Sequence, residues 1–386
     1  MCAGHDPDRR SPRLALLFPA RSVHHHVSAV LAKIGVSSRT AAAREAARMG
    51  LRLSPRGVMF SPWTEDDCAA LVRHAEGMSD HDLSAAQFRA LYDRVKHLSR
   101  REPADRRGAL NNIAPAQVTA AAGSVRRGRA VSLAAPIDSE VAADNPDPAV
   151  HQMVQPGTDP VPASGLSFAM DRVAMNIHGN ADSHIDALCH VIFDGTLYNG
   201  LDAHAVTAAG ATELSIEVAS DGIVGRGLLL DIPRLRQVPW LEPGDHVTAD
   251  DLINAEAAQE VRIQQGDLLF VRVGHRSRRR AVGPWDSAAA RAGLHPAALE
   301  LLAERRIAVL GSDGNNDTAP SAAEGVGFPV HVLAINAMGL HLLDWLQFDD
   351  LVAVCEELNR WSFLCVIAPL RLRAGTGSPV NPIAIF

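Results

Sequence analysis

Short apolar runs alternate with amphipathic stretches over the last two thirds of the chain. Runs of this length are typical of strands, and stretches with apolar residues three and four apart are typical of helices. The expected strands are residues 130–134, 227–232, 267–273, 307–311 and 363–369. The clearest expected helices are residues 250–259 and 296–305. Alternating strands and helices predict an α/β (α+β) domain over residues 129–386.

Helical spacing dominates the earlier part of the chain. Apolar residues recur three and four apart in residues 22–35, 39–49, 64–78 and 84–99. These segments are therefore expected to be helices, forming a helical N-terminal extension. Residues 101–128 are polar and arginine-rich, which favours a linker. The expected organisation is a first segment of residues 1–55, a helical arm and linker of residues 56–128, and the domain.

The net charge differs in sign between the beginning of the chain and the remainder. The formal net charge is −7, but residues 1–60 carry +7 and residues 61–386 carry −14. A basic start suggests an anionic partner, whereas an acidic body argues against nucleic acid as the main partner. The expected partner of the body is a small molecule.

Cysteine usage and hydropathy indicate a cytoplasmic globular protein. The five cysteines are scattered and form no CxxC pair, which is typical of a reducing compartment. No apolar run approaches the ~18 residues of a membrane span. The apolar run of residues 14–18 behind Arg9 and Arg10 is too short for a signal peptide. We therefore expect no membrane partner.

The densest polar chemistry lies in HGNADSHIDALCH, residues 178–190. His184 and Asp186 are two apart, so an extended segment points both side chains the same way. Asp186 and His190 are four apart, so a helix beginning at Asp186 stacks them on one face. Imidazole and carboxylate ligands without thiolate suit zinc or manganese at a hydrolytic site. A hydrogen-bonded turn with a helix cap explains the same spacing, and the pattern alone leaves both interpretations open.

Several motifs share their order with one family of enzymes. They are HIDALCH, FDGTLYNG, GRGLLLDIPRL, GDLLFVRVG, AGLHPAAL, LGSDGNND, PVHVLAINAMGLHLLD and the terminal GTGSPVNPIAIF. Over residues 130–386 the chain resembles the cyclase family of metal-dependent hydrolases, which includes bacterial kynurenine formamidase and isatin hydrolase. The resemblance implies a swivelling β/β/α domain in a homodimer. It also implies hydrolysis of a small cyclic or aromatic amide, lactam or lactone.

The resemblance also implies roles for particular residues. His184 and Asp186 match the metal ligands of the family motif, and His190 matches its acid/base. His331 and Asp344 are expected to complete the site for a divalent metal, zinc or manganese. With a metal-activated water, His190 would take and return the proton during hydrolysis.

Two departures from the family motif, His-x-x-x-His-x-Asp-x-x-x-His, bear on the number of metal ions. Asn180 stands where the motif has its first histidine, and Asp344 replaces a glutamate and lies one position further on. An amide oxygen is a weak ligand, so we expect a single catalytic ion. His178 would replace the missing histidine if the backbone shifted locally.

Other polar and aromatic residues keep two interpretations each. His295 either lines the pocket or caps the helix that follows it. Asp313, Asn316 and Asp317 either support the site or form a turn. The aromatic residues Phe193, Tyr198, Trp240 and Trp285 either form a wall for a flat substrate or belong to the core. Residues 276–280, rich in arginine, are expected to form a solvated loop, and the second interpretation is that they bind a carboxylate of the substrate.

A second resemblance concerns the basic start of the chain. Residues 22–51 resemble the recognition helix and final helix of a LuxR-type helix-turn-helix, but only residues 13–18 remain for the helix before them. A recognition helix without that scaffold is poorly positioned to read a groove. The segment is either a fragment without DNA function or part of a DNA-binding regulator. In the second case the hydrolase-like domain would sense a small molecule without turning it over.

Overall fold

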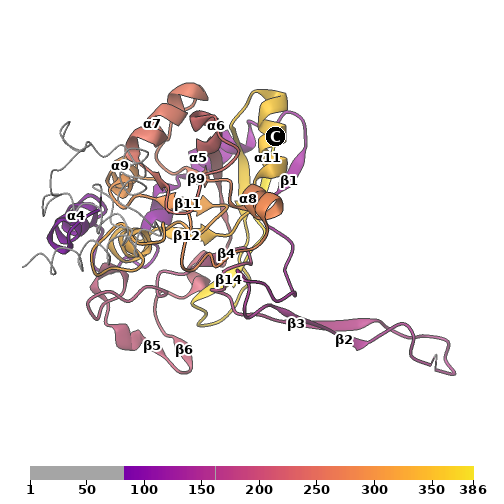
Figure 1. Cartoon of the computed structure of the whole chain (residues 1–386). Coiled ribbons are helices and arrows are strands. Elements are labelled where there is room, and N and C mark those ends of the chain that lie inside the picture. The colour runs from indigo at the N-terminus through magenta and orange to yellow at the C-terminus, as the bar shows by residue number, and fades with distance from the viewer. Residues whose placement is uncertain (1–81, 161) are drawn as a thin grey trace, which may run out of the picture. The chain divides into compact units, whose positions relative to one another are not determined.

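A nine-stranded mixed sheet organises the computed structural model, which describes residues 82–160 and 162–386 (Figure 1). The helix-turn-helix resemblance and the helices expected at 22–35, 39–49 and 64–78 lie outside these residues. The strand order is β1-β15-β13-β7-β9-β11-β12-β4-β14. The strands are β1 Ala130–Ser132, β4 His184–Asp186, β7 Ile223–Asp231, β9 Leu268–Arg272, β11 Val309–Ser312, β12 His341–Asp344, β13 Ser362–Ile367, β14 Gly377–Pro379 and β15 Ile383–Ile385.

The direction of the strands changes from the middle of the sheet to its sides. Strands β7, β9, β11 and β12 are adjacent at the centre of the sheet and run parallel to one another. On one side β4 pairs antiparallel with β12, and β14 pairs antiparallel with β4. On the other side β13, β15 and β1 add three antiparallel pairings. The parallel centre explains why its strands read as continuous apolar runs, since both faces are buried.

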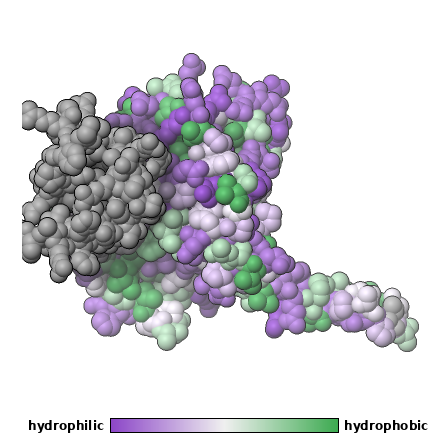
Figure 2. Space-filling view, viewed as in Figure 1, coloured by the Kyte–Doolittle hydropathy of each residue, from purple (hydrophilic) through white to green (hydrophobic). Residues whose placement is uncertain are grey.

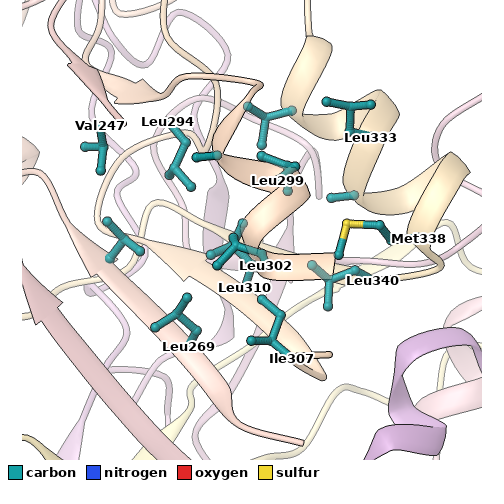
Figure 3. Close-up of a cluster of buried hydrophobic side chains, with 14 of the residues drawn as sticks. Val247, Leu269, Leu294, Leu299, Leu302, Ile307, Leu310, Leu333, Met338 and Leu340 are labelled. Atoms are coloured by element: carbon teal, nitrogen blue, oxygen red, sulfur yellow. The ribbon is translucent and has the colours of Figure 1, made fainter. Parts of the chain in front are cut away.

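Apolar side chains alternate between two hydrophobic cores, one on each face of the sheet. On β7, Leu228 and Leu230 join one core and Leu229 joins the other. This follows the two-residue period of a strand. Helix α9 (Ala298–Arg305) buries Leu299 and Leu302 in the first core, where Leu310 of β11 also lies (Figure 3). Each such side chain contributes about 1.5–3 kcal/mol relative to remaining exposed.

Helices cover both faces, which confirms the α/β class expected from the sequence. They are α4 Ala85–Leu98, α5 Pro115–Ala122, α6 Ile232–Arg236, α7 Ala249–Ala258, α8 His275–Val282, α9, α10 Pro329–His331, the π-helix η5 Val332–Met338 and α11 Asp349–Leu358. The expected strands and the helices at 84–99, 250–259 and 296–305 are present within a few residues of their predicted ends. No helix in the described part of the chain is long and apolar enough to cross a membrane.

Two sequence interpretations were wrong in this region. Residues 101–128 are not only linker, because they hold the 3₁₀ helix η1 (Gly108–Asn112) and α5. Buried Leu110 ties η1 into the second core. The arginine-rich run 276–280 is not a loop but most of helix α8. Its positive charge is balanced locally, since Arg279 pairs with Asp138 and Asp144.

Short elements complete the architecture. Strands β2 (Val150–Gln155) and β3 (Met170–Ala174) form a separate two-stranded antiparallel arm that extends away from the sheet (Figure 1). Two more small sheets pair β5 Val206–Thr207 with β6 Gly210–Ala211, and β8 His246–Val247 with β10 Gly293–Leu294. The remaining 3₁₀ turns are η2 Tyr198–Gly200, η3 Ala203–Ala205 and η4 Ile216–Ala219.

Candidate metal centre and active site

The candidate ligands meet where β12 ends and β4 begins. His184 and Asp186 are alternate residues of β4, so their side chains leave the same face of the sheet. Asp344, the last residue of β12, lies directly opposite His184 in the antiparallel register. His331 comes from α10, in the chain segment that leads from β11 to β12. Three separate elements thus supply four side chains.

Short distances join these four residues, called here the buried cluster. His331 Nε2 lies 3.4 Å from Asp186 Oδ2 and 3.3 Å from Asp344 Oδ2. His184 Nε2 lies 3.7 Å from Asp186 Oδ1. One potential ligand atom from each of His184, Asp186 and Asp344 falls within 4.8 Å of the others. All four side chains are buried.

Each histidine of the buried cluster is oriented through its other ring nitrogen. His184 Nδ1 donates to the carbonyl oxygen of Asp182 at 2.9 Å. His331 Nδ1 lies 2.5 Å from Asp317 Oδ2. Because a carbonyl and a carboxylate both accept, these bonds place a proton on Nδ1 of each ring and turn Nε2 toward the cluster. Partners of this kind are typical of metal-ligating histidines.

Asp317 and its neighbours also hold the rest of the cluster in place. The Asp317 carboxylate accepts from the backbone N–H groups of Val330 and His331, which start α10. Asp344 accepts from the backbone N–H of Asn316 at 3.1 Å and from its side-chain amide at 2.6 Å. The side-chain amide of Asn315 donates to the second oxygen of Asp344. These contacts place Asn316 and Asp317 in the supporting role that the sequence left open.

One carboxylate oxygen of Asp186 accepts a hydrogen bond, and the other accepts none from the described residues. Its Oδ1 accepts from His178 Nδ1 at 2.9 Å, whereas Oδ2 is buried without a hydrogen-bond partner among the described residues. Burial alone would raise the pKa of this carboxyl group, but His190, His178 and His331 together hold the pKa well below its usual value. The group is therefore an ionised carboxylate with a free electron pair inside the protein.

His178 and His190, called here the outer histidine pair, lie beside the buried cluster. Their rings are stacked, with centroids 3.7 Å apart and planes 7° from parallel. His178 Nε2 lies 3.0 Å from the Thr376 hydroxyl. The ring of His190 has no hydrogen-bond partner in the described part of the chain, so both nitrogens are available. Burial lowers the pKa of His190 to about 4, against the opposing effect of Asp186, and the ring is neutral near pH 7.

The helix expected between Asp186 and His190 is absent, and that prediction was wrong. The backbone N–H groups of Ala187 and Cys189 donate to the carbonyls of Thr376 and Leu214 instead of to a helix. His190 closes a turn by donating from its backbone to Ala187. The turn still brings His190 to Asp186, as the helix was expected to do. Cys189 is buried among the apolar residues of the second core.

Asn180 and His295 lie differently from the ligand set. Asn180 is half-buried and makes no hydrogen bond to the cluster, whereas His178 does. His295 is buried beside His246, with ring centroids 5.5 Å apart. Its Nδ1 accepts from the backbone N–H of Ala297, just before α9. The N-cap residue of α9 is Ala297 and no side chain caps it, so both interpretations of His295 stay predictions.

The contacts of the four aromatic residues singled out from the sequence are with residues outside the buried cluster. Phe193 packs on Phe88 and Tyr92, and the buried Tyr198 donates its hydroxyl to Asp105. The indole N–H groups of the two tryptophans, Trp240 and Trp285, donate to Glu242 and to the carbonyl of Ala290.

A different aromatic residue lies beside the cluster. The ring of Phe328 is 5.6 Å from that of His331, centroid to centroid, and Phe328 is 51% exposed. No motif in the sequence marked this position, because Phe328 precedes the segment that carries His331.

Sequence reasoning also missed two residues behind the ligand strands. His341 is fully buried and its Nδ1 donates to the backbone carbonyl of Asp186 at 2.7 Å. Arg276 donates to the carbonyls of Ala181 and Trp345, which flank β4 and β12. Both residues bond to backbone carbonyls rather than to side chains. No sequence pattern around either residue indicates this role.

Comparisons with known proteins agree with this architecture. The model of the Cyclase family, described as "Putative cyclase", matches residues 112–316, a little over half of the chain. The chain belongs to this cyclase family. The match covers β4 and His190 but ends before His331 and Asp344. A search of curated proteins found no significant match.

Solved structures of the cyclase fold can be superposed on most of the described chain. A crystal structure of a novel cyclase aligns at 30% identity, with a TM-score of 0.67 over 74% of this chain and 97% of that one. An isatin hydrolase A from Labrenzia aggregata, bound to benzyl benzoate, aligns at 20% identity over 69% of this chain and 96% of that one, with a TM-score of 0.49. The first alignment confirms the expected cyclase-family fold.

Proposed function

We propose that this cyclase-family protein is a metal-dependent hydrolase that opens the amide, lactam or lactone bond of a small cyclic or aromatic substrate. The observation that carries the proposal is the convergence of His184, Asp186, His331 and Asp344 beside a histidine with free ring nitrogens. Nothing in this arrangement requires a covalent nucleophile, since Cys189 is buried and burial raises its thiol pKa to about 11.

The donor set fits a divalent ion such as zinc or manganese. Two imidazole nitrogens and two carboxylates point inward, and Asp186 Oδ2 is buried without a hydrogen-bond partner in the described chain. An ion would satisfy that oxygen and offset the repulsion between two buried carboxylates. In this assignment His184, Asp186, His331 and Asp344 hold one ion. A bound divalent ion acidifies a water molecule and polarises a substrate carbonyl.

His190 is the proposed acid/base of the reaction. Its ring is neutral at pH 7 because burial lowers its pKa to about 4, and a neutral imidazole accepts a proton from the attacking water. The same nitrogen then returns the proton to the leaving nitrogen or oxygen. His178 stacks on His190 and is tied to Asp186 and Thr376, so it orients the ring that moves the proton.

Phe328 is the proposed contact for an apolar or flat substrate. The ring is half exposed, lies beside His331 and has the guanidinium of Arg291 5.2 Å from its centroid. The Arg291 guanidinium covers part of the Phe328 ring, and the exposed remainder of the ring is free to pack on a substrate. Phe328→Leu is expected to raise KM for aromatic substrates more than for aliphatic ones.

The test is hydrolysis by chelated protein reloaded with zinc or manganese. Substrates would include an aryl formamide, an aromatic lactam, an aliphatic lactam and a lactone, followed by product chromatography. The proposal predicts bond opening that disappears with the chelator and returns with stoichiometric metal. Protein that binds metal stoichiometrically but opens none of the four bond types would contradict the activity. Hydrolysis that survives complete metal removal would contradict the mechanism.

A further inference from the structure

Three arginines at the ends of α4 and α9 have no carboxylate partner in the described chain. Hydrophilic residues cover much of the described surface in the view of Figure 2. Many arginines of the described chain pair with a carboxylate, as Arg278 does with Glu242. Arg100, Arg101 and Arg306 form no ion pair with any described residue. Their positive charges are therefore not balanced by the protein itself.

These three side chains line one cavity. It measures about 190 Å³ and lies between the C-terminal end of α4, the 3₁₀ helix η1 and the C-terminal end of α9. Ser99 and Asn112 are the other polar residues of its wall, the rest of the wall is apolar, and no aspartate or glutamate contributes to it. Pockets for drug-sized ligands usually measure ~300–1,000 Å³. This cavity therefore suits a smaller molecule, and its charge favours an anion.

Arg101 is held in a fixed position at the cavity. Its guanidinium donates to the side-chain oxygen of the buried Asn112, which in turn donates its amide to the carbonyl of Ile307 at 3.0 Å. The Nε of Arg101 is buried and has no hydrogen-bond partner among the described residues. A buried donor without an acceptor is unfavourable. An anion in the cavity would supply that acceptor.

The ends of the two helices account for only part of this positive charge. The C-terminal end of a helix carries roughly half a negative charge, which makes basic residues favourable there. Two such ends offset about one of the three arginine charges. Neither Arg100 nor Arg306 donates a side-chain hydrogen bond to a helix carbonyl within residues 82–160 and 162–386. The cavity thus keeps a net positive charge after both helix ends are considered.

Charge and shape select a phosphate group as the ligand. A phosphate monoester carries about 1.5 to 2 negative charges at pH 7 and three acceptor oxygens on one phosphorus atom. A carboxylate carries one charge and two oxygens. Guanidinium groups bind phosphate through paired N–H donors. We propose that this cavity, called here the arginine cavity, binds the phosphate group of a small phosphate monoester. The apolar part of the wall contacts the carbon portion of the ligand.

The arginine cavity lies outside the candidate metal centre. Met338, which lines the cavity, is the last residue of η5, whereas His331 directly precedes the first residue of η5. A phosphate in the cavity is therefore held by arginines and not by a metal ion. Its affinity should be the same for chelated protein and for protein reloaded with metal, whatever bond the enzyme hydrolyses.

Isothermal titration calorimetry of the full chain with glycerol 3-phosphate tests the proposal at constant ionic strength. One molecule per chain is expected to bind, with a Kd below ~1 mM. Succinate carries two charges on separate carboxylates and is expected to bind at least ~10-fold more weakly. The absence of binding at ~10 mM glycerol 3-phosphate would overturn the proposal. Equal affinity for succinate would overturn the assignment to phosphate, and binding that requires the metal would overturn the location.

Two variants and a control locate the site. Arg101→Gln keeps an amide that can donate to Asn112 but removes the charge. Arg306→Gly removes a guanidinium where the backbone φ is 55°, a conformation that glycine favours, so this variant should melt like wild type. Each change should weaken glycerol 3-phosphate binding by about 10- to 100-fold. Arg127→Gln changes an exposed arginine outside the cavity and should bind like wild type. Unchanged affinity in either cavity variant would contradict the proposed site.

Discussion

The buried cluster and the outer histidine pair lie side by side but differ in how they are held. The four residues of the cluster come mostly from ends of regular elements, and Asp317, Asn315 and Asn316 fix the side chains of His331 and Asp344. The outer pair sits on irregular segments, and His190 has no side-chain hydrogen bond within the described residues. Rigid, charged positions suit holding a cation, whereas a neutral ring with free nitrogens suits proton transfer.

The two regions also differ in their electrostatics. In the cluster, histidines and carboxylates stabilise each other's charged forms. Burial would lower the pKa of His331, but Asp344, Asp186 and Asp317 raise it well above its usual value. In the outer pair, burial dominates and His190 is left neutral. The comparison therefore predicts that substitutions in the cluster remove the metal, whereas substitutions in the outer pair slow catalysis and leave the metal bound.

Asp186→Ala is expected to have the largest effect, because Asp186 contacts both regions. The variant should lose its metal and all measurable hydrolysis, since one proposed ligand and the partner of His178 disappear together. Elemental analysis after dialysis measures the metal, and product formation measures activity. Asp202→Ala, an exposed aspartate paired only with His204, is the matched control. Full metal occupancy in Asp186→Ala would remove Asp186 from the ligand set.

His190→Gln is expected to separate chemistry from metal binding. The rate constant kcat should fall by about 10²- to 10⁴-fold, the usual contribution of a general acid/base, while the metal content stays near that of wild type. Exposed His204→Gln serves as the control. Loss of the metal together with activity would show that His190 is a ligand, and the proposed distinction between the two regions would fail.

Asp317→Asn tests how far orientation by hydrogen bonds matters within the cluster. The amide keeps the approximate shape but loses the charge that faces His331 Nδ1. Metal affinity is expected to fall by about 10- to 100-fold, as for other partners of metal-bound histidines. Competition with a chelator of known affinity measures the change. An unchanged affinity would mean that backbone contacts alone position His331.

His178→Gln should have the smallest effect of the four. The variant loses an imidazole that stacks on His190, but an amide can still bond to Asp186 or Thr376. One such hydrogen bond contributes about 0.5–1.5 kcal/mol, so we expect kcat to fall by roughly tenfold or less with metal retained. Loss of one equivalent of metal would instead make His178 the ligand that Asn180 does not provide.

The fold was predictable because its strands and helices are long enough for their periods to show. Buried parallel strands such as β9 read as continuous apolar runs, and α7 and α9 showed helical spacing. The linker assignment failed because η1 and α5 are short. Their packing depends on residues far away in sequence, for example Asn112, whose side-chain amide donates to the carbonyl of Ile307.

From spacing alone, the candidate site was predictable only where its residues are close in sequence, whereas His331 and Asp344 were predicted from the family resemblance. The two-residue spacing of His184 and Asp186 indicated a shared face, and β4 has that geometry. The turn at residues 187–190 was not predictable, because the backbone bonds that replace the helix come from Leu214 and Thr376. The role of Arg276 was hidden for the same reason, since both of its acceptor carbonyls are distant in the chain.

The π-helix η5 gives a physical account of the altered spacing before Asp344. A π-helical turn closes its hydrogen bonds over five residues rather than four, so it accommodates an additional residue within a helix. Here η5 begins directly after His331 and ends shortly before β12. In the proposed ligand set, this π-helix is compatible with the additional residue that the family resemblance implies between His331 and Asp344. His331 Nε2 lies 3.3 Å from Asp344 Oδ2.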